Sequence, residues 1–230
     1  NVVQDHACIF YYVRSPRLYQ VLDLYERVKD VARGAALMTG TELEIVLNDG
    51  LCDYVPNDVL SQLLYESFCE VGGPRFSTEE KALAAEFAKT FDPAAVADKA
   101  RTLSAHFGPE IAEQYKDQIL VEDIFPYHAT DLISSGSTDV GDVSYCTPTA
   151  QLGTCCWANG TPGHTWQVAA QDGSSIGHKG MIAASKALAL AVIRTMEDPE
   201  LLKKAHEEYV KTTGGKYICP VPPETVPLFD

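Results

Sequence analysis

The sequence predicts an α/β chain, because two strand-like runs enclose a long amphipathic helix at its start and turn-rich segments alternate with helices in its second half. Residues 7–13 are apolar, β-branched and aromatic, and residues 41–47 alternate between apolar and acidic side chains, as in a half-buried strand. Between them, apolar side chains recur at helical spacing from residue 18 to residue 35. Two strands and one helix leave a sheet face uncovered, so we expect residues 1–50 to be only part of a domain.

Capping residues predict the ends of this first helix. Ser15 and Pro16 suit its N-cap and its first helical position. Gly40 suits its C-cap, because glycine adopts the left-handed backbone that commonly ends a helix. The Asn-Asp-Gly sequence of residues 48–50 then ends the second strand-like run.

Residues 57–118 have a helical pattern throughout. Asn57 is the predicted N-cap of the first helix in this stretch, and residues 77–80 (STEE) form a capping box for the next. Asp92 and Pro93 begin a further helix. We interpret the stretch as a helical connector with an acidic, solvated face.

The second half combines polar, glycine-rich turns with short apolar runs. The predicted loops are residues 136–144, 160–164 and 174–180, the strand-like runs are 143–145 and 155–157, and the helices are 181–196 and one that begins at Asp198-Pro199 and ends at Gly214-Gly215. Sites in α/β proteins are commonly built where strands end and helices begin.

Composition excludes several classes of protein. Eighteen basic residues against 32 acidic ones give a net charge of −14, which repels nucleic acid. The apolar run at residues 187–193 is far shorter than the roughly 20 residues of a membrane span. The seven cysteines are odd in number and contain no Cys-x-x-Cys pair, which favours reduced thiols. With no signal peptide visible at the first residue, we expect a soluble, cytoplasmic protein.

Histidines in the glycine-rich loops are the first candidates for chemistry. His164 and His178 each lie in such a loop before the long helix, and histidine is the commonest metal ligand, although a loop histidine is more often structural or merely exposed. Cys155 or Cys156 with His164 would suggest a thiol hydrolase, but cysteines in an apolar run are usually core residues. No phosphate-binding loop, Gly-x-Ser-x-Gly or His-Glu-x-x-His motif is present.

Charged residues beside the strand-like runs give further candidates. Asp139 and Asp142 are three residues apart and suit either a metal site or ordinary turn and capping roles. Arg14 ends an apolar run, where it either extends to solvent or binds an anion. From the residues alone, the sequence supports a cluster of hydrolase-like or binding-site loops.

Four segments together resemble the M20 family of metallopeptidases and amidohydrolases, and within it the p-aminobenzoyl-glutamate hydrolase branch with its aminoacylase-like relatives. They are residues 1–3 (NVV), 12–14 (YVR), 136–144 (GSTDVGDVS) and 160–164 (GTPGH). The family has a catalytic α/β domain, which is split in sequence by an inserted lid domain that dimerises. The resemblance implies that residues 1–50 are part of the lid and that residues 51–230, including the helical connector 57–118, are the C-terminal part of the catalytic domain.

The resemblance also implies roles for individual residues. Asn1 and Arg14 correspond to the lid pair that holds the substrate carboxylate, for which an arginine fork is well suited. His164 corresponds to the metal ligand supplied after the lid, and His178 is a second candidate for that ligand. The residues that correspond to the substrate-binding loops are Gly136, Ser137, Thr138, Asp139 and Gly163.

The activity implied is hydrolysis of the amide bond of an N-acyl or N-aroyl amino acid, with divalent metal ions, zinc or manganese, in the intact family member. In the family, the other metal ligands and the general-base glutamate precede the lid, and the sequence contains no counterpart of them. We therefore expect this chain alone to be inactive, and we assign no catalytic residue to it. The alternative is a non-catalytic binding or dimerisation module. The partners expected are the small-molecule substrate and a second copy or a sister subunit, without nucleic acid or membrane.

Overall fold

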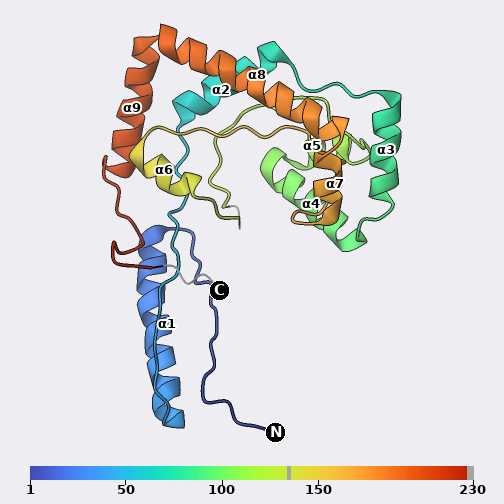
Figure 1. Ribbon diagram of the computed structural model, residues 1–230. Helices are drawn as coiled ribbons and strands as arrows, with labels where there is room; N and C mark the ends of the chain where they lie inside the picture. The colour runs from blue at the N-terminus through green and yellow to red at the C-terminus, as the bar shows by residue number, and fades with distance from the viewer. Residues whose placement is uncertain (134–135, 227–230) are drawn as a thin grey trace. The chain divides into compact units, whose positions relative to one another are not determined.

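The computed structural model describes residues 1–133 and 136–226, and in this part of the chain the regular structure is α-helical, without β-strands (Figure 1). Turns and extended segments connect the helices. The helices are α1 (Leu18–Thr39), α2 (Asp58–Val71), α3 (Thr78–Ala88), α4 (Pro93–Phe107), α5 (Pro109–Tyr115), α6 (Val140–Cys146), α7 (Trp166–Asp172), α8 (Ser175–Glu197) and α9 (Pro199–Thr213).

The predicted α/β class is therefore wrong for this structure. Residues 7–13 and 41–47 do not form strands, and side chains such as Phe10, Tyr12 and Val46 are exposed. An extended segment becomes a strand only when a neighbouring segment pairs with its N–H and C=O groups. Alternating hydrophobicity predicts which side of a strand would be buried, but it does not supply that neighbour.

Two predictions in the second half are also wrong. The run 143–145 lies in α6, and 155–157 has no regular structure. The stretch 174–180 is mostly the first turns of α8, with Ser174 as its N-cap, rather than a loop. Its glycines serve close packing, because a Cβ on Gly180 would collide with the carbonyl oxygen of Cys155.

The predicted helix ends are mostly confirmed. Asn57 caps α2 by accepting a hydrogen bond from the Leu60 N–H at 3.0 Å, and Ser77 with Glu80 forms the capping box of α3. Gly40 ends α1 with a φ of 65°. The start of α1 differs, because Arg17 and not Ser15 is its N-cap residue.

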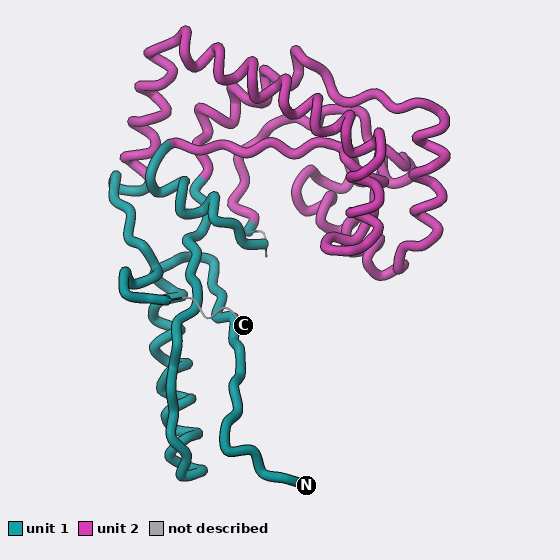
Figure 2. Tube along the Cα trace, viewed as in Figure 1, with its two compact units in different colours: residues 1–55, 133–147, 213–230 teal, residues 56–132, 148–212 magenta. Residues whose placement is uncertain are grey.

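The chain divides into two compact units (Figure 2). Unit 1 comprises Asn1–Val55, Ile133–Thr147 and Thr213–Asp230, and unit 2 comprises Pro56–Leu132 and Pro148–Thr212. The domain limits expected at residue 50 stay a prediction.

Unit 2 is organised around α8, which packs along α2 and α7. Its small buried residues Ala183, Ala187 and Ala191 allow close contact with Phe68 and Leu64 of α2. A second apolar cluster includes Phe76, Ala84, Leu120, Ala158 and Ile176.

By length and composition alone, α8 is also apolar enough to cross a membrane, and about one third of its apolar stretch is buried. A single helix of this length and composition is also typical of the core of a soluble protein, so it does not by itself indicate a membrane span.

Candidate functional site

The GSTDVGDVS segment is irregular over residues 136–139, as predicted, but its second part, from Val140 onward, lies in α6 rather than in a loop. Gly136, Ser137, Thr138 and Asp139 are exposed, and Asp139 is the N-cap residue of α6, although its side chain makes no capping hydrogen bond. The Thr138 carbonyl accepts a hydrogen bond from the Gly141 N–H at 3.0 Å, which closes the first turn. The structure thus places the predicted substrate-binding residues of this segment on the surface of unit 1.

The second part of the segment holds α6 against residues 52–55. The Cys52 N–H donates to Asp142 Oδ2 at 3.1 Å, and the Val55 N–H donates to Ser144 Oγ at 2.9 Å. Gly141 is required by the close approach, because a Cβ there would collide with the Cys52 carbonyl oxygen. These small and polar residues therefore have a structural role inside unit 1.

Asp142 fits this structural role better than that of a metal ligand. Its second oxygen, Oδ1, accepts a hydrogen bond from the Tyr217 hydroxyl at 2.9 Å, so both carboxylate oxygens are engaged. Burial, together with the hydrogen bond and charge of Asp142, raises the pKa of the Cys52 thiol to about 12. At neutral pH this thiol stays protonated, and it is a weak nucleophile.

The predicted carboxylate binders, Asn1 and Arg14, are exposed in the extended segment before α1. The guanidinium carbon of Arg14 lies 5.6 Å from the centre of the Tyr12 ring, within the range of a cation–π contact. The start of α1 is fixed nearby, because Asp53 accepts hydrogen bonds from the Leu18 N–H at 2.9 Å and from the Arg17 side chain at 3.0 Å.

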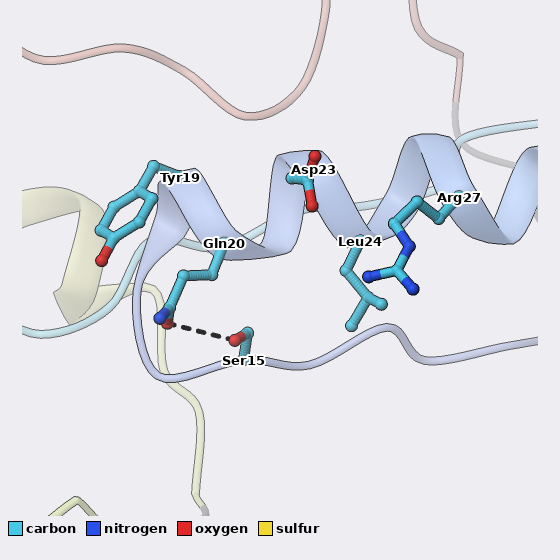
Figure 3. Close-up of a pocket in the computed structure, with 6 residues that line it drawn as sticks. All are labelled: Ser15, Tyr19, Gln20, Asp23, Leu24 and Arg27. Atoms are coloured by element: carbon cyan, nitrogen blue, oxygen red, sulfur yellow. Dashed lines mark hydrogen bonds between the residues drawn. The ribbon is translucent and has the colours of Figure 1, made fainter.

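An open hollow of about 380 Å³ lies beside α1, next in sequence to Arg14 (Figure 3). Ser15 donates a hydrogen bond to Gln20 across one end of it at 3.2 Å. The lining side chains are Ser15, Tyr19, Gln20, Asp23, Leu24 and Arg27. The hollow is open to solvent, and its lining carries one acidic and one basic side chain, Asp23 and Arg27.

His164 lies in the loop before α7 and is exposed, as is Gly163 beside it. Its φ of 57° is left-handed, which is uncommon for a residue with a side chain and has a cost in free energy that other contacts must offset. Thr165 Oγ1 donates to the Pro162 carbonyl at 2.9 Å and tightens the turn that contains His164.

His178 is not a loop residue as predicted. It lies in the first turns of α8, where its side chain is exposed and its backbone N–H donates to the Ser174 carbonyl. Within residues 1–133 and 136–226, no group of three His, Cys, Asp or Glu side chains is placed to hold a metal ion.

The thiol-hydrolase alternative is disfavoured by the surroundings of the paired cysteines. Burial raises the pKa of the Cys155 thiol to about 11 and also raises that of Cys156. The Cys155 thiol donates to the Trp157 carbonyl at 3.5 Å. A protonated, half-buried thiol with its hydrogen already shared is poorly suited to nucleophilic attack.

Sequence reasoning missed two buried glutamines of α7, Gln167 and Gln171. Gln171 is fully buried and is hydrogen-bonded to the loop that carries His164. The available signal was their spacing, since two amides four residues apart in a short alanine-containing helix lie on one face.

Comparison with known proteins identifies the chain as a relative of a hydrolase subunit. It is 36% identical over 231 aligned residues to one of the subunits of p-aminobenzoyl-glutamate hydrolase from Escherichia coli (strain K12). The alignment covers 99% of this chain and 48% of the relative, so the chain spans about half the length of the curated relative that it matches. This similarity confirms the resemblance to that branch. No family model matches the chain, and no solved structure gives a significant match.

Proposed function

We propose that this chain is part of a metal-dependent amidohydrolase that cleaves the amide bond of an N-acyl or N-aroyl amino acid, such as an aroyl-glutamate. The observation that carries the proposal is the 36% identity to the p-aminobenzoyl-glutamate hydrolase relative along 99% of this chain. A substrate of this class carries at least one carboxylate, which suits an arginine-containing binding site.

Individual residues then have separate roles. Arg14 and Asn1 bind the substrate carboxylate, and the exposed guanidinium of Arg14 lies in an extended segment from which it can make that contact. His164 supplies one ligand of a zinc or manganese site, for which its exposed imidazole is suited. A bound metal of this kind polarises a carbonyl and activates water. The exposed loop residues Gly136, Ser137, Thr138, Asp139 and Gly163 contribute to substrate binding.

Activity requires polypeptide in addition to this chain. This part of the proposal is supported by the relative, which is about twice as long as the part matched here. The proposal is therefore that the chain acts in a cytoplasmic assembly that supplies the remaining ligands and the general base.

The test uses the tagged chain expressed in its native cell and isolated with whatever binds it. Hydrolysis of p-aminobenzoyl-glutamate and metal content by elemental analysis are measured on this sample and on the chain alone. We expect the isolated assembly to hydrolyse the substrate and the chain alone not to do so. Arg14→Ala should raise KM about tenfold or more, as loss of a charge-assisted hydrogen bond predicts. His164→Ala should lower metal content.

Two controls accompany these variants. Arg101, on the exposed face of α4, and His206, exposed on α9, offer the same residue types at positions without a proposed role. Arg101→Ala and His206→Ala should leave KM and metal content unchanged. Unchanged kinetics and metal content in both Arg14→Ala and His164→Ala would refute the roles.

A second candidate function, that of an assembly module, is favoured by the outer face of α8. Apolar side chains on this face are between 46% and 78% exposed, whereas the alanines on the opposite face are buried. They are Met181, Ile182, Leu188, Val192, Ile193 and Met196. An exposed apolar stripe of this length usually marks a protein contact.

We propose a sister subunit as the occupant of this face, because the relative is itself named as a subunit. The net charge of −14 disfavours an anionic membrane as the alternative. Val192→Glu should release the partner from the isolated assembly, and Val210→Glu, at an exposed valine of α9, should not. Light scattering on the assembly measures the change in mass, and retention of the full mass in Val192→Glu would refute the contact.

A further inference from the structure

The loop that carries His164 contains two left-handed residues. Gly160 has a φ of 86° and His164 a φ of 57°. Glycine adopts such a backbone easily, whereas histidine does so at a cost in free energy that contacts elsewhere in the loop must offset. The conformation at His164 therefore depends on the contacts that hold the loop on either side of it.

The side chain of Gln171 is bound to this loop at two points. Its Oε1 accepts a hydrogen bond from the Ala158 N–H at 2.8 Å, and its Nε2 donates to Thr161 Oγ1 at 3.2 Å. Nε2 also donates to the Gln167 carbonyl at 3.0 Å, one turn earlier in α7. The amide is fully buried, so these bonds have no competition from water.

Thr161 completes a closed network with the same groups. Its hydroxyl donates to the Ala158 carbonyl at 2.6 Å, and its backbone N–H donates to the same oxygen at 3.0 Å. Both Ala158 and Thr161 are almost fully buried. One amide from the helix that follows His164 therefore fixes the segment that precedes His164.

The start of the loop is also anchored on its other side. The Asn159 N–H donates to the Ile119 carbonyl at 2.8 Å, and its side-chain amide donates to the Tyr115 carbonyl at 3.1 Å. Ala158 packs in the apolar cluster with Phe76 and Ile176. Gln171 is thus the link between a fixed core segment and α7, with His164 on the short connection between them.

Gln167 provides an internal comparison. It is also buried in α7, but its Nε2 lies near the carbonyl and hydroxyl of Thr90, at 3.5 and 3.4 Å, and its Oε1 has no hydrogen-bond partner. Neither of these hydrogen bonds joins the Gln167 side chain to the 158–165 loop. The two glutamines have similar burial but different partners.

We propose that Gln171 is a positioning residue, whose buried amide holds the 158–165 loop in the conformation that presents the His164 imidazole. The inference about the loop stands on this network, and its link to metal binding rests on the proposed function.

The test compares Gln171→Leu with Gln167→Leu in the full chain. Each variant replaces a buried amide by an apolar group of similar size, so the two changes differ mainly in the hydrogen bonds that they remove. Only Gln171→Leu should accelerate amide hydrogen exchange at Ala158 and Thr161, by about tenfold or more relative to Gln167→Leu. It should also shift the imidazole resonances of His164 in a long-range ¹⁵N NMR spectrum.

Equal exchange rates and equal imidazole resonances in the two variants would overturn the inference. If Gln171→Leu fails to fold, Gln171→Glu is the second variant, because its carboxylate still accepts from Ala158 but cannot donate to Thr161. It should give a smaller acceleration of exchange at Thr161, and exchange as in the unmodified chain would count against the proposal.

Metal content of the isolated assembly separates this inference from the proposed function. If Gln171→Leu loosens the loop while His164→Ala leaves metal content unchanged, the loop network stands and the proposed metal role fails. If His164→Ala removes metal while Gln171→Leu leaves the loop exchange unchanged, the metal role stands and the positioning role fails.

Discussion

Replacing Glu80 by glutamine tests the electrostatic stability of unit 2. The Glu80 carboxylate is largely buried and accepts hydrogen bonds from Lys179 Nζ at 2.6 Å and from the Ser77 N–H at 2.6 Å. Hydrogen bonds from Lys179, which is the largest cause, from the Ser175 side chain and from the Ser77 N–H lower its pKa from 4.5 to about 2. The carboxylate therefore favours the folded state whenever it is ionised.

The pKa shift sets the magnitude of the effect. Lowering the pKa from 4.5 to about 2 corresponds to about 3.5 kcal/mol at most, since a tenfold change in an acid dissociation constant is about 1.4 kcal/mol. Lys179 is partly exposed, and water screens its charge. Glutamine also keeps an acceptor for the Ser77 N–H. We therefore expect Glu80→Gln to lower the free energy of unfolding by about 2 kcal/mol at pH 7.

The pH dependence has a definite sign. A carboxyl group whose folded pKa is depressed contributes stability above its unfolded pKa, and this contribution is lost as the pH falls toward the folded value. The difference between the unmodified chain and Glu80→Gln should thus be constant above pH 5 and shrink between about pH 4.5 and pH 2.

Urea unfolding followed by tryptophan fluorescence measures this difference, because both tryptophans, Trp157 and Trp166, lie in unit 2. The matched control is Glu86→Gln, which removes an exposed carboxylate from the same helix and an ion pair with Lys89. The control should change stability by less than about 0.5 kcal/mol. Equal stabilities for Glu80→Gln and Glu86→Gln at pH 7, or a difference that does not shrink in acid, would refute the reasoning.

Three further predictions concern the other sites. Gly141→Ala should destabilise unit 1 by about 2 kcal/mol, because its Cβ would meet the Cys52 carbonyl, whereas Gly34→Ala has open space around it and should not destabilise α1; thermal unfolding followed by circular dichroism distinguishes them. A thiol reagent at pH 8 should modify the four exposed cysteines quickly and leave Cys52 unmodified, and fast labelling at Cys52 in a peptide digest would contradict its raised pKa. Chelation of the isolated assembly should abolish hydrolysis, and added zinc or manganese should restore it; full activity after complete metal removal would contradict the proposed metal dependence.

Local chemistry explains why many helix ends were predictable. The Asn57 cap and the Ser77–Glu80 capping box each join residues three apart, so the sequence holds both partners of the interaction. Gly40 likewise ends α1 through its own backbone preference. The similarity to the hydrolase branch was also contained in short contiguous motifs.

The errors arose where the outcome depended on distant partners. Residues 7–13 have strand-like side chains, but the described chain pairs no neighbouring segment with them. The glycines of residues 174–180 predict a loop, yet Gly177 and Gly180 allow α8 to approach the backbone of other segments. The same residue type thus indicates a turn in one setting and close packing in another.

The sequence by itself determined many of the helix ends, the acidic character and the family resemblance, because each follows from neighbouring residues or from composition. Only the tertiary structure decided that Asp142 holds the Cys52 backbone and that Gln171 holds the loop of His164. These roles depend on burial and on hydrogen bonds between segments, and the contact of Asp142 with Cys52 spans 90 positions. The sequence alone does not show whether folding will surround a polar side chain with hydrogen-bond partners or leave it in water.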